Sequence, residues 1–307
     1  MPQHTISSAH FQEFPIPHPP FRRAPKGSAF LRSLRIAISC IALILPLLLT
    51  TPARAAHVHA ELLSDTSAIQ PGKPFWLAVQ LTIDEGWHIY WKNPGDSGIP
   101  TRVNFKLPEG FTAGPLQFPT PHRFSQPGNL TIFGYEGSVL LLTQITPPAT
   151  LPPDFQGQFA ANISWLVCQE ECIPGKATVN LTLSSATSAQ PNNRELFDGW
   201  ISQLPVDSAH SSDISAVNST FSGKTCTLTV TWTHAAPDSI DFLPDPSDDY
   251  TIGPADVKSS QNTTVITFTA DLLAGKHPGP TTMQAVLGFQ SDQQNRRGIN
   301  IPVALPG

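Results

Sequence analysis

The stretch Lys176-Ala177-Thr178-Val179-Asn180-Leu181-Thr182-Leu183 places an apolar residue at every second position. Successive side chains of a β-strand point to opposite faces, so this pattern predicts a strand with one buried face. Strand patterns bounded by turn residues recur at 76–83, 139–145, 159–167, 225–232, 263–268 and 298–305. Because helical periodicity is scarce and proline is abundant, with 32 residues, we expect an all-β protein built from antiparallel sandwiches.

One segment breaks the strand pattern. After a polar stretch at 184–193, apolar residues follow at helical spacing and predict a short amphipathic helix over 194–204. We therefore expect two β-sandwich domains joined by a short helical linker. The first sandwich is assigned to residues 56–186, the linker to 187–206 and the second sandwich to 207–307.

Residues 1–55 have the pattern of a secretory signal peptide. Basic residues precede an apolar run at 36–49, and Ala53 and Ala55 then stand at A-x-A spacing. The run is shorter than the roughly 20 residues that a membrane span needs, although an uncleaved anchor is the alternative. We expect a cleaved signal and an exported protein. The remaining 12 basic and 22 acidic side chains give a net charge of −10, which argues against nucleic acid as a partner.

The pair Cys168 and Cys172 is the main chemical feature of the exported part. A disulfide that closes so small a loop stabilises by only about 2 kcal/mol on the chain-entropy estimate. A dithiol that switches between oxidised and reduced states explains the spacing better. The alternatives are a structural disulfide at a hairpin tip and a two-thiol metal clip completed by histidines. The histidines available for such a clip are His57, His59, His88 and His122.

The residues around this pair bear on the reactivity of its thiols, and the strand pattern around the third exported cysteine bears on its burial. Glu170 and Glu171 disfavour a thiolate and should raise the cysteine pKa. Cys226 is in phase with Leu228 and Val230 on the apolar face of its strand, so we expect an unpaired, buried cysteine.

Four segments in a fixed order resemble the periplasmic N-terminal region of DsbD-type thiol:disulfide interchange proteins, and most closely their ScsB-like branch. These segments are 86–98 (GWHIYWKNPGDSG), 118–124 (FPTPHRF), 133–137 (FGYEG) and 165–174 (WLVCQEECIP). The resemblance covers roughly residues 57–185 strongly and the second β region more weakly. It implies an immunoglobulin-like fold for the sandwich and an electron-carrying Cys168–Cys172 pair that needs no cofactor and no metal.

The same resemblance implies roles for single residues. Cys172 would form the mixed disulfide with a partner, and Cys168 would resolve it. A cap that shields the pair would correspond to 129–137, with Phe133 and Tyr135 as its aromatic residues. His88 and Tyr90 match family positions on a strand near the pair. The alternative for His88 is an ordinary strand residue without a role in exchange. The alternative for Phe133 and Tyr135 is packing between the two sheets.

The resemblance also implies partners. The sequence has no multi-helix membrane domain before it ends at Gly307, so we expect a membrane-embedded thiol:disulfide electron donor in trans and oxidised periplasmic thiol proteins as clients. Protein-disulfide reductase activity would then depend on that separate donor. The competing hypotheses are a non-catalytic interaction sandwich with a permanent disulfide and a copper-handling module.

Overall fold

The computed structural model describes residues 53–55, 57–276, 279, 281–290 and 296–305. The predicted signal peptide lies outside the described residues, apart from 53–55, which form β1 (Ala53–Ala55) on the edge of a sheet. Its cleavage therefore stays a prediction. Among the described residues, no helix is long and apolar enough to cross a membrane.

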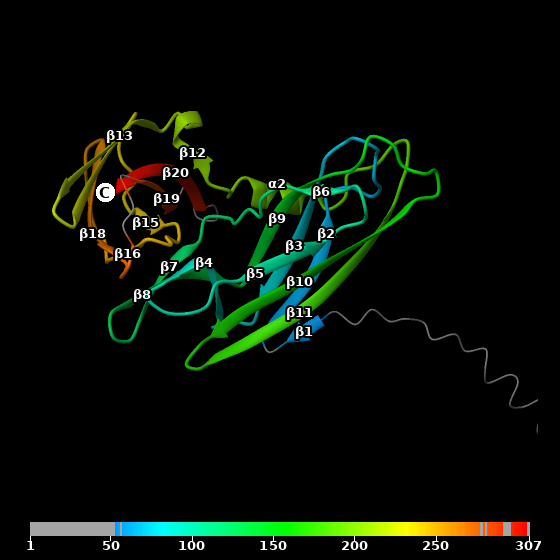
Figure 1. The fold of residues 1–307 in the computed structure, drawn as a ribbon, viewed down its shortest axis with the longest axis horizontal. Coiled ribbons are helices and arrows are strands. Elements are labelled where there is room, and N and C mark those ends of the chain that lie inside the picture. The colour runs from blue at the N-terminus through cyan, green and yellow to red at the C-terminus, as the bar shows by residue number, and fades with distance from the viewer. Residues whose placement is uncertain (1–52, 56, 277–278, 280, 291–295, 306–307) are drawn as a thin grey trace, which may run out of the picture. The chain divides into compact units, whose positions relative to one another are not determined.

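The first sandwich consists of two antiparallel sheets (Figure 1). One sheet has the order β1, β2 (Val58–Ser64), β3 (Phe75–Ile83), β9 (Ser138–Thr146) and β6 (Thr112–Ala113). The other has the order β11 (Cys172–Ser184), β10 (Gln156–Cys168), β4 (His88–Gly95), β8 (Leu130–Glu136) and β7 (His122–Gln126), with β5 (Arg102–Lys106) also paired to β10.

The second sandwich also has two sheets. Its first sheet has the order β12 (Val206–Asp207), β20 (Arg296–Leu305), β19 (Thr281–Gln290) and β15 (Asp241–Pro244). Its second has β13 (Ile214–Ser222), β14 (Thr225–Trp232), β18 (Thr263–Leu272) and β16 (Tyr250–Ile252), with β17 (Asp256–Ser260) on β18. The predicted all-β fold with two sandwiches is confirmed. Among the described residues, the two-residue strand β12 differs from the antiparallel expectation because it runs parallel to β20, and the isolated bridge between Ile69 and Ser185 is also parallel.

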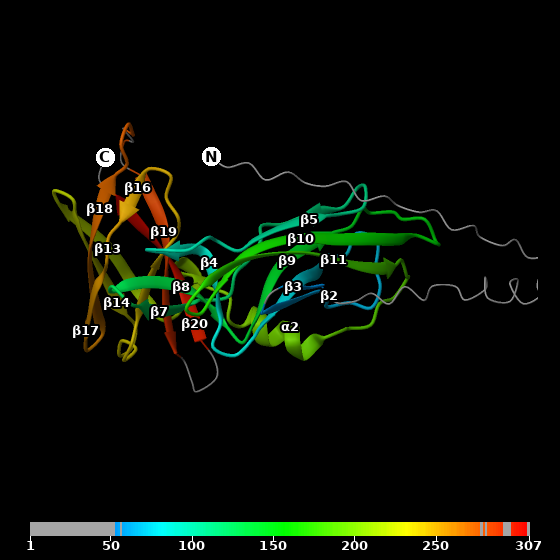
Figure 2. The ribbon, with the colours of Figure 1, turned by 90° about the horizontal axis from the view of Figure 1, so that it is seen from below.

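The predicted helix is α2 (Arg194–Ile201), and a short 3₁₀ helix at Ser208–His210 follows it. Phe197 of α2 is buried with Ala78, Leu140 and Leu142, which lie on the outer face of β3 and β9. The helix therefore covers this sheet on the side away from β10 and β11 (Figure 2). The helix was predicted to continue to 204, but residues 202–203 form a turn and residue 204 a bend.

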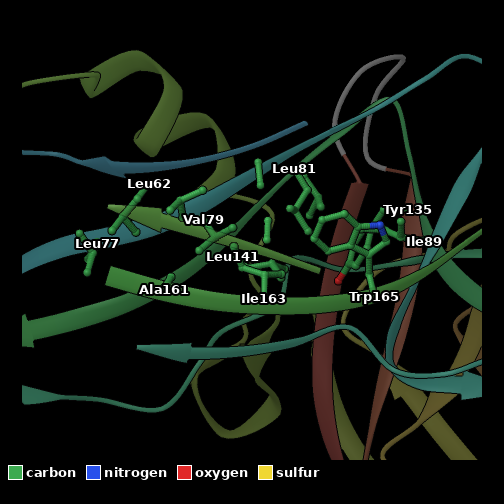
Figure 3. Packing of buried hydrophobic residues seen from close by; sticks show 14 of the residues in the cluster. Leu62, Leu77, Val79, Leu81, Ile89, Tyr135, Leu141, Ala161, Ile163 and Trp165 are labelled. Atoms are coloured by element: carbon green, nitrogen blue, oxygen red, sulfur yellow. The ribbon is translucent and has the colours of Figure 1, made fainter. Parts of the chain in front are cut away.

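The main core lies between the two sheets of the first sandwich. The alternating residues of β10 and β11 supply one side of it, including Ala161, Ile163 and Trp165, and β2, β3 and β9 supply the other (Figure 3). Leu243 and Val286 come from the second sandwich and are fully buried in this same cluster. The two sandwiches therefore share buried apolar surface, although the second has a core of its own.

Candidate functional site

The two cysteines lie at the tip of the long hairpin β10–β11. The strands stay in register for 13 pairs, from Gln156↔Ser184 to Cys168↔Cys172, and only residues 169–171 connect them. The structure joins Cys168 to Cys172 in a disulfide. Cys168 is completely buried, whereas Cys172 is exposed. A reagent or a protein thiol therefore reaches Cys172 before it reaches Cys168.

Cys226 is unpaired and buried in the second core, as expected. Burial raises the pKa of its thiol above the ordinary value, which keeps it protonated and a poor nucleophile.

Tyr90 on β4 provides the polar contact to the disulfide. The strand alternates, so that Ile89 faces the core while His88 and Tyr90 face the same side as Cys168. The Tyr90 hydroxyl donates to Cys168 Sγ at 3.2 Å and lies 3.9 Å from Cys172 Sγ. Burial raises the pKa of Tyr90, so the phenol remains a proton donor to sulfur at neutral pH.

Gly98 fixes the Tyr90 ring in this position. A Cβ atom at residue 98 would lie 2.2 Å from the Tyr90 ring, and its φ of +111° is a conformation that other residues rarely adopt. The loop that carries Gly98 is tied to β8, because the Asp96 carboxylate accepts from the Thr131 backbone amide at 2.7 Å. The backbone at Gly98 thus packs directly on the ring that contacts the sulfur atoms.

His88 is the cross-strand partner of Cys168 and is 8% exposed. Its ring meets Tyr90 edge-on, with centroids 5.4 Å apart, and its Nε2 lies 3.3 Å from Gln126 Nε2. Burial lowers the pKa of His88, because desolvation disfavours the imidazolium, so the ring is neutral at pH 7. His88 therefore belongs to the surroundings of the pair, where it contacts Tyr90 and Gln126.

Phe124 on β7 and Ile132 on β8 complete the apolar side of the site. Tyr90, Ile132 and Cys168 form one buried cluster, and the partly buried Phe124 packs against it. Phe124 also stacks on His88, with centroids 5.7 Å apart. Phe124 is the last residue of the 118–124 segment, but it was not among the residues predicted for the site. The sequence shows that His122 and Phe124 share one face of a strand, but not that this face packs against the cysteine pair.

Phe133 and Tyr135 lie on the opposite face of the β7–β8 hairpin. Phe133 packs edge-on against Trp91, and the Tyr135 hydroxyl donates to the Pro119 carbonyl at 2.7 Å. Figure 3 shows Tyr135 beside Ile89 and Trp165 in the main core. They therefore belong to the same hairpin as Phe124 but face the other way, and their shielding role stays a prediction.

Of the four histidines considered for a metal clip, His88 lies opposite Cys168, whereas His57 and His59 have other partners. His57 pairs with Asp84 and stacks on Trp87, while His59 contacts Glu61. Within the part of the chain that the structure describes, no group of three or more His, Cys, Asp or Glu side chains has the arrangement of a metal site.

Comparisons with known proteins bear on this geometry. Residues 59–184 match the family model described as thiol:disulfide interchange protein DsbD, N-terminal. The first sandwich is a member of the DsbD N-terminal family. The matched segment contains both cysteines, Tyr90 and the β7–β8 hairpin, so the recognition from sequence motifs is confirmed.

Solved structures extend the likeness to most of the chain. The crystal structure of the N-terminal periplasmic domain of ScsB from Proteus mirabilis superposes with a TM-score of 0.62 at 18% identity. The match covers 84% of this chain and 97% of that one, and it shows a shared fold. The DsbD N-terminal domain of Neisseria meningitidis in its reduced form matches 43% of this chain and 90% of its own, with a TM-score of 0.25 and 12% identity. A comparison with curated protein sequences finds no match.

Proposed function

We propose that this chain is a periplasmic thiol:disulfide exchange module that carries electrons through Cys168 and Cys172. The observation that supports this most directly is the unequal exposure of the two sulfur atoms. Exchange requires one accessible sulfur for the partner and a second, close sulfur that completes the reaction. A purely structural disulfide would need neither the exposed Cys172 nor the tyrosine hydroxyl on the buried Cys168.

The reduction of the module proceeds in two exchanges. A thiolate of the electron donor attacks Cys172 Sγ, forms a mixed disulfide and releases Cys168 as a thiolate, which takes up a proton. A second donor thiolate then attacks the donor sulfur of the mixed disulfide and releases Cys172. The donor dithiol becomes a disulfide, and the Cys168–Cys172 disulfide becomes a dithiol. Two electrons and two protons have then passed from the donor to the module.

The delivery of electrons reverses these steps on a client. The Cys172 thiolate attacks a client disulfide and releases one client thiol, and Cys168 then attacks Cys172 Sγ and releases the other. Tyr90 assists at the buried sulfur, because a hydroxyl that donates to a thiolate stabilises the charge. The expected donor is a separate membrane-embedded thiol protein, and the expected clients are oxidised periplasmic thiol proteins.

Shielding is part of this proposal. An electron carrier in an oxidising compartment benefits from a cover over its dithiol, and the β7–β8 hairpin supplies one through Phe124. Phe133 and Tyr135 would support this cover from the core side of the same hairpin.

Trapping of mixed disulfides tests the assignment of roles. With glutathione disulfide as the probe, the Cys168→Ser variant is expected to accumulate a stable adduct on Cys172, because the resolving thiol is missing. The Cys172→Ser variant is expected to form little adduct, because Cys168 is buried. Adduct formation only in the Cys172→Ser variant would reverse the roles, and its absence in both variants would favour a structural disulfide.

A further inference from the structure

The second sandwich holds the segment that leads into β7. Thr120 is 3% exposed, and its side chain fits against Gly288 and Gly298, which are cross-strand partners in β19 and β20. A Cβ atom on Gly298 would lie 2.3 Å from Thr120 Oγ1, and one on Gly288 would lie 3.1 Å from Thr120 Cγ2. Two facing glycines thus form a recess that side chains at those positions would fill.

Arg296 contacts the next residue of the same segment. Its side chain is almost buried, and its Nε donates to the Pro121 carbonyl at 2.6 Å. Its Nη2 donates to the Asp241 carboxylate at 2.5 Å within the second sandwich. A charged donor in a partly buried place makes a strong hydrogen bond, so this contact fixes the backbone at Pro121 firmly.

Pro121 directly precedes the strand that covers the cysteine pair. β7 begins at His122, and Phe124 and Gln126 follow on the same face. Phe124 packs on the cluster of Tyr90 and Cys168, and Gln126 reaches His88. A continuous set of contacts therefore runs from Arg296 through the start of β7 to the disulfide.

We propose that Arg296 is a positioning residue for the Cys168–Cys172 site. By holding Pro121, it keeps β7 in the place from which Phe124 covers Tyr90 and the buried sulfur. The second sandwich then has a specific task, which is to fix the base of the hairpin that limits access to the buried sulfur of Cys168. This inference depends on the proposed function only in taking the cysteine pair as the reactive group.

Alkylation of the reduced full chain with iodoacetamide tests the proposal. Tandem mass spectrometry follows the labelling of Cys168 separately, because Cys172 is exposed and reacts whether or not β7 is in place. The Arg296→Ala variant is expected to label at least about tenfold faster than wild type, since the loss of one hydrogen bond from a charged donor shifts a local opening equilibrium by that order. The sandwiches should stay joined in this variant, because Lys92 still pairs with Asp245 at 2.7 Å and Leu243 and Val286 remain buried in the main core.

Arg297→Ala is the matched control. Arg297 is the next residue on β20, but it is exposed and contacts Asp213 and the Phe289 ring, both in the second sandwich. Its loss is expected to leave the labelling rate unchanged. Gly298→Ala provides a second perturbation without removing a charge, and it is expected to speed labelling in the same way by displacing Thr120.

Combining these changes with Phe124→Ala distinguishes the positioning of β7 by Arg296 from a general loss of stability of the fold. If Arg296 acts through β7, Arg296→Ala adds no further acceleration once Phe124 is absent. Wild-type labelling rates in both Arg296→Ala and Gly298→Ala would overturn the proposal, as would full additivity with Phe124→Ala. Because alkylation involves no donor or client protein, a failure of the exchange function would leave this readout intact, and the two hypotheses fail separately.

Discussion

Replacing Tyr90 with Phe removes the hydroxyl that donates to Cys168 Sγ but keeps the ring that packs under Gly98. A hydrogen bond to a charged group contributes about 1.5–3 kcal/mol, and one pKa unit corresponds to about 1.4 kcal/mol. In the reduced protein, loss of this donor is therefore expected to raise the lower thiol pKa of the pair by about 1–2 units. The effect should concentrate on Cys168, because the hydroxyl lies 3.2 Å from Cys168 Sγ and 3.9 Å from Cys172 Sγ.

The assay is the thiolate ultraviolet absorbance of the reduced protein, followed over a pH titration. Since the two thiols are coupled, the titration gives two macroscopic pKa values that belong to the pair. Tyr135→Phe is the matched control, because it removes a buried hydroxyl that donates to the Pro119 carbonyl and not to sulfur. That variant is expected to lose about 1 kcal/mol of stability and to keep the wild-type thiol pKa. An unchanged thiol pKa in Tyr90→Phe would refute the reasoning.

Two further changes probe the same surroundings. Gly98→Ala is expected to destabilise the fold by at least about 2 kcal/mol and to raise the thiol pKa as Tyr90→Phe does, because it combines backbone strain with a clash against the Tyr90 ring. Urea unfolding and thiolate titration measure both effects. The control Gly275→Ala has a similar positive φ, +80°, and open space around it, so a shifted thiol pKa there would argue against the clash. His88→Gln is expected to reduce the pH dependence of the free energy of unfolding at acid pH. Burial lowers the folded pKa of His88, so the unfolded chain binds its proton first, and wild type loses stability as the pH falls below about 6.5. Urea unfolding at several pH values measures this pH dependence. An unchanged pH dependence in His88→Gln would contradict its assignment to His88. An equal reduction in the control His234→Gln, at an exposed position, would also contradict it.

The strands were predictable because alternation reports directly on burial. β14 has the predicted bounds, Thr225–Trp232, and β11 extends the predicted strand to Cys172. The alternation in β11 also located the cysteines at a strand connection, and the order of motifs identified the family. These are local signals, since each depends on residues that are adjacent in sequence.

The surroundings of the pair were harder to predict because they depend on contacts between distant strands. The register of β4 against β8 shifts between Tyr90 and Gly95, and a sequence pattern does not reveal such a bulge. Phe133 and Phe124 both belong to the β7–β8 hairpin, and only the pairing of its strands shows that Phe124 is on the face that packs against Tyr90, Ile132 and Cys168. The recess for Thr120 likewise arises from two glycines that meet only when β19 and β20 pair.

The reduction potential of the Cys168–Cys172 disulfide tests the central claim most directly. Equilibration of the wild-type protein with glutathione and dithiothreitol buffers, followed by quantification of the oxidised fraction, gives this value. An exchange module is expected to equilibrate between about −120 and −270 mV, the range of working thiol:disulfide proteins. A potential below about −300 mV, where structural disulfides of secreted proteins lie, would contradict the account.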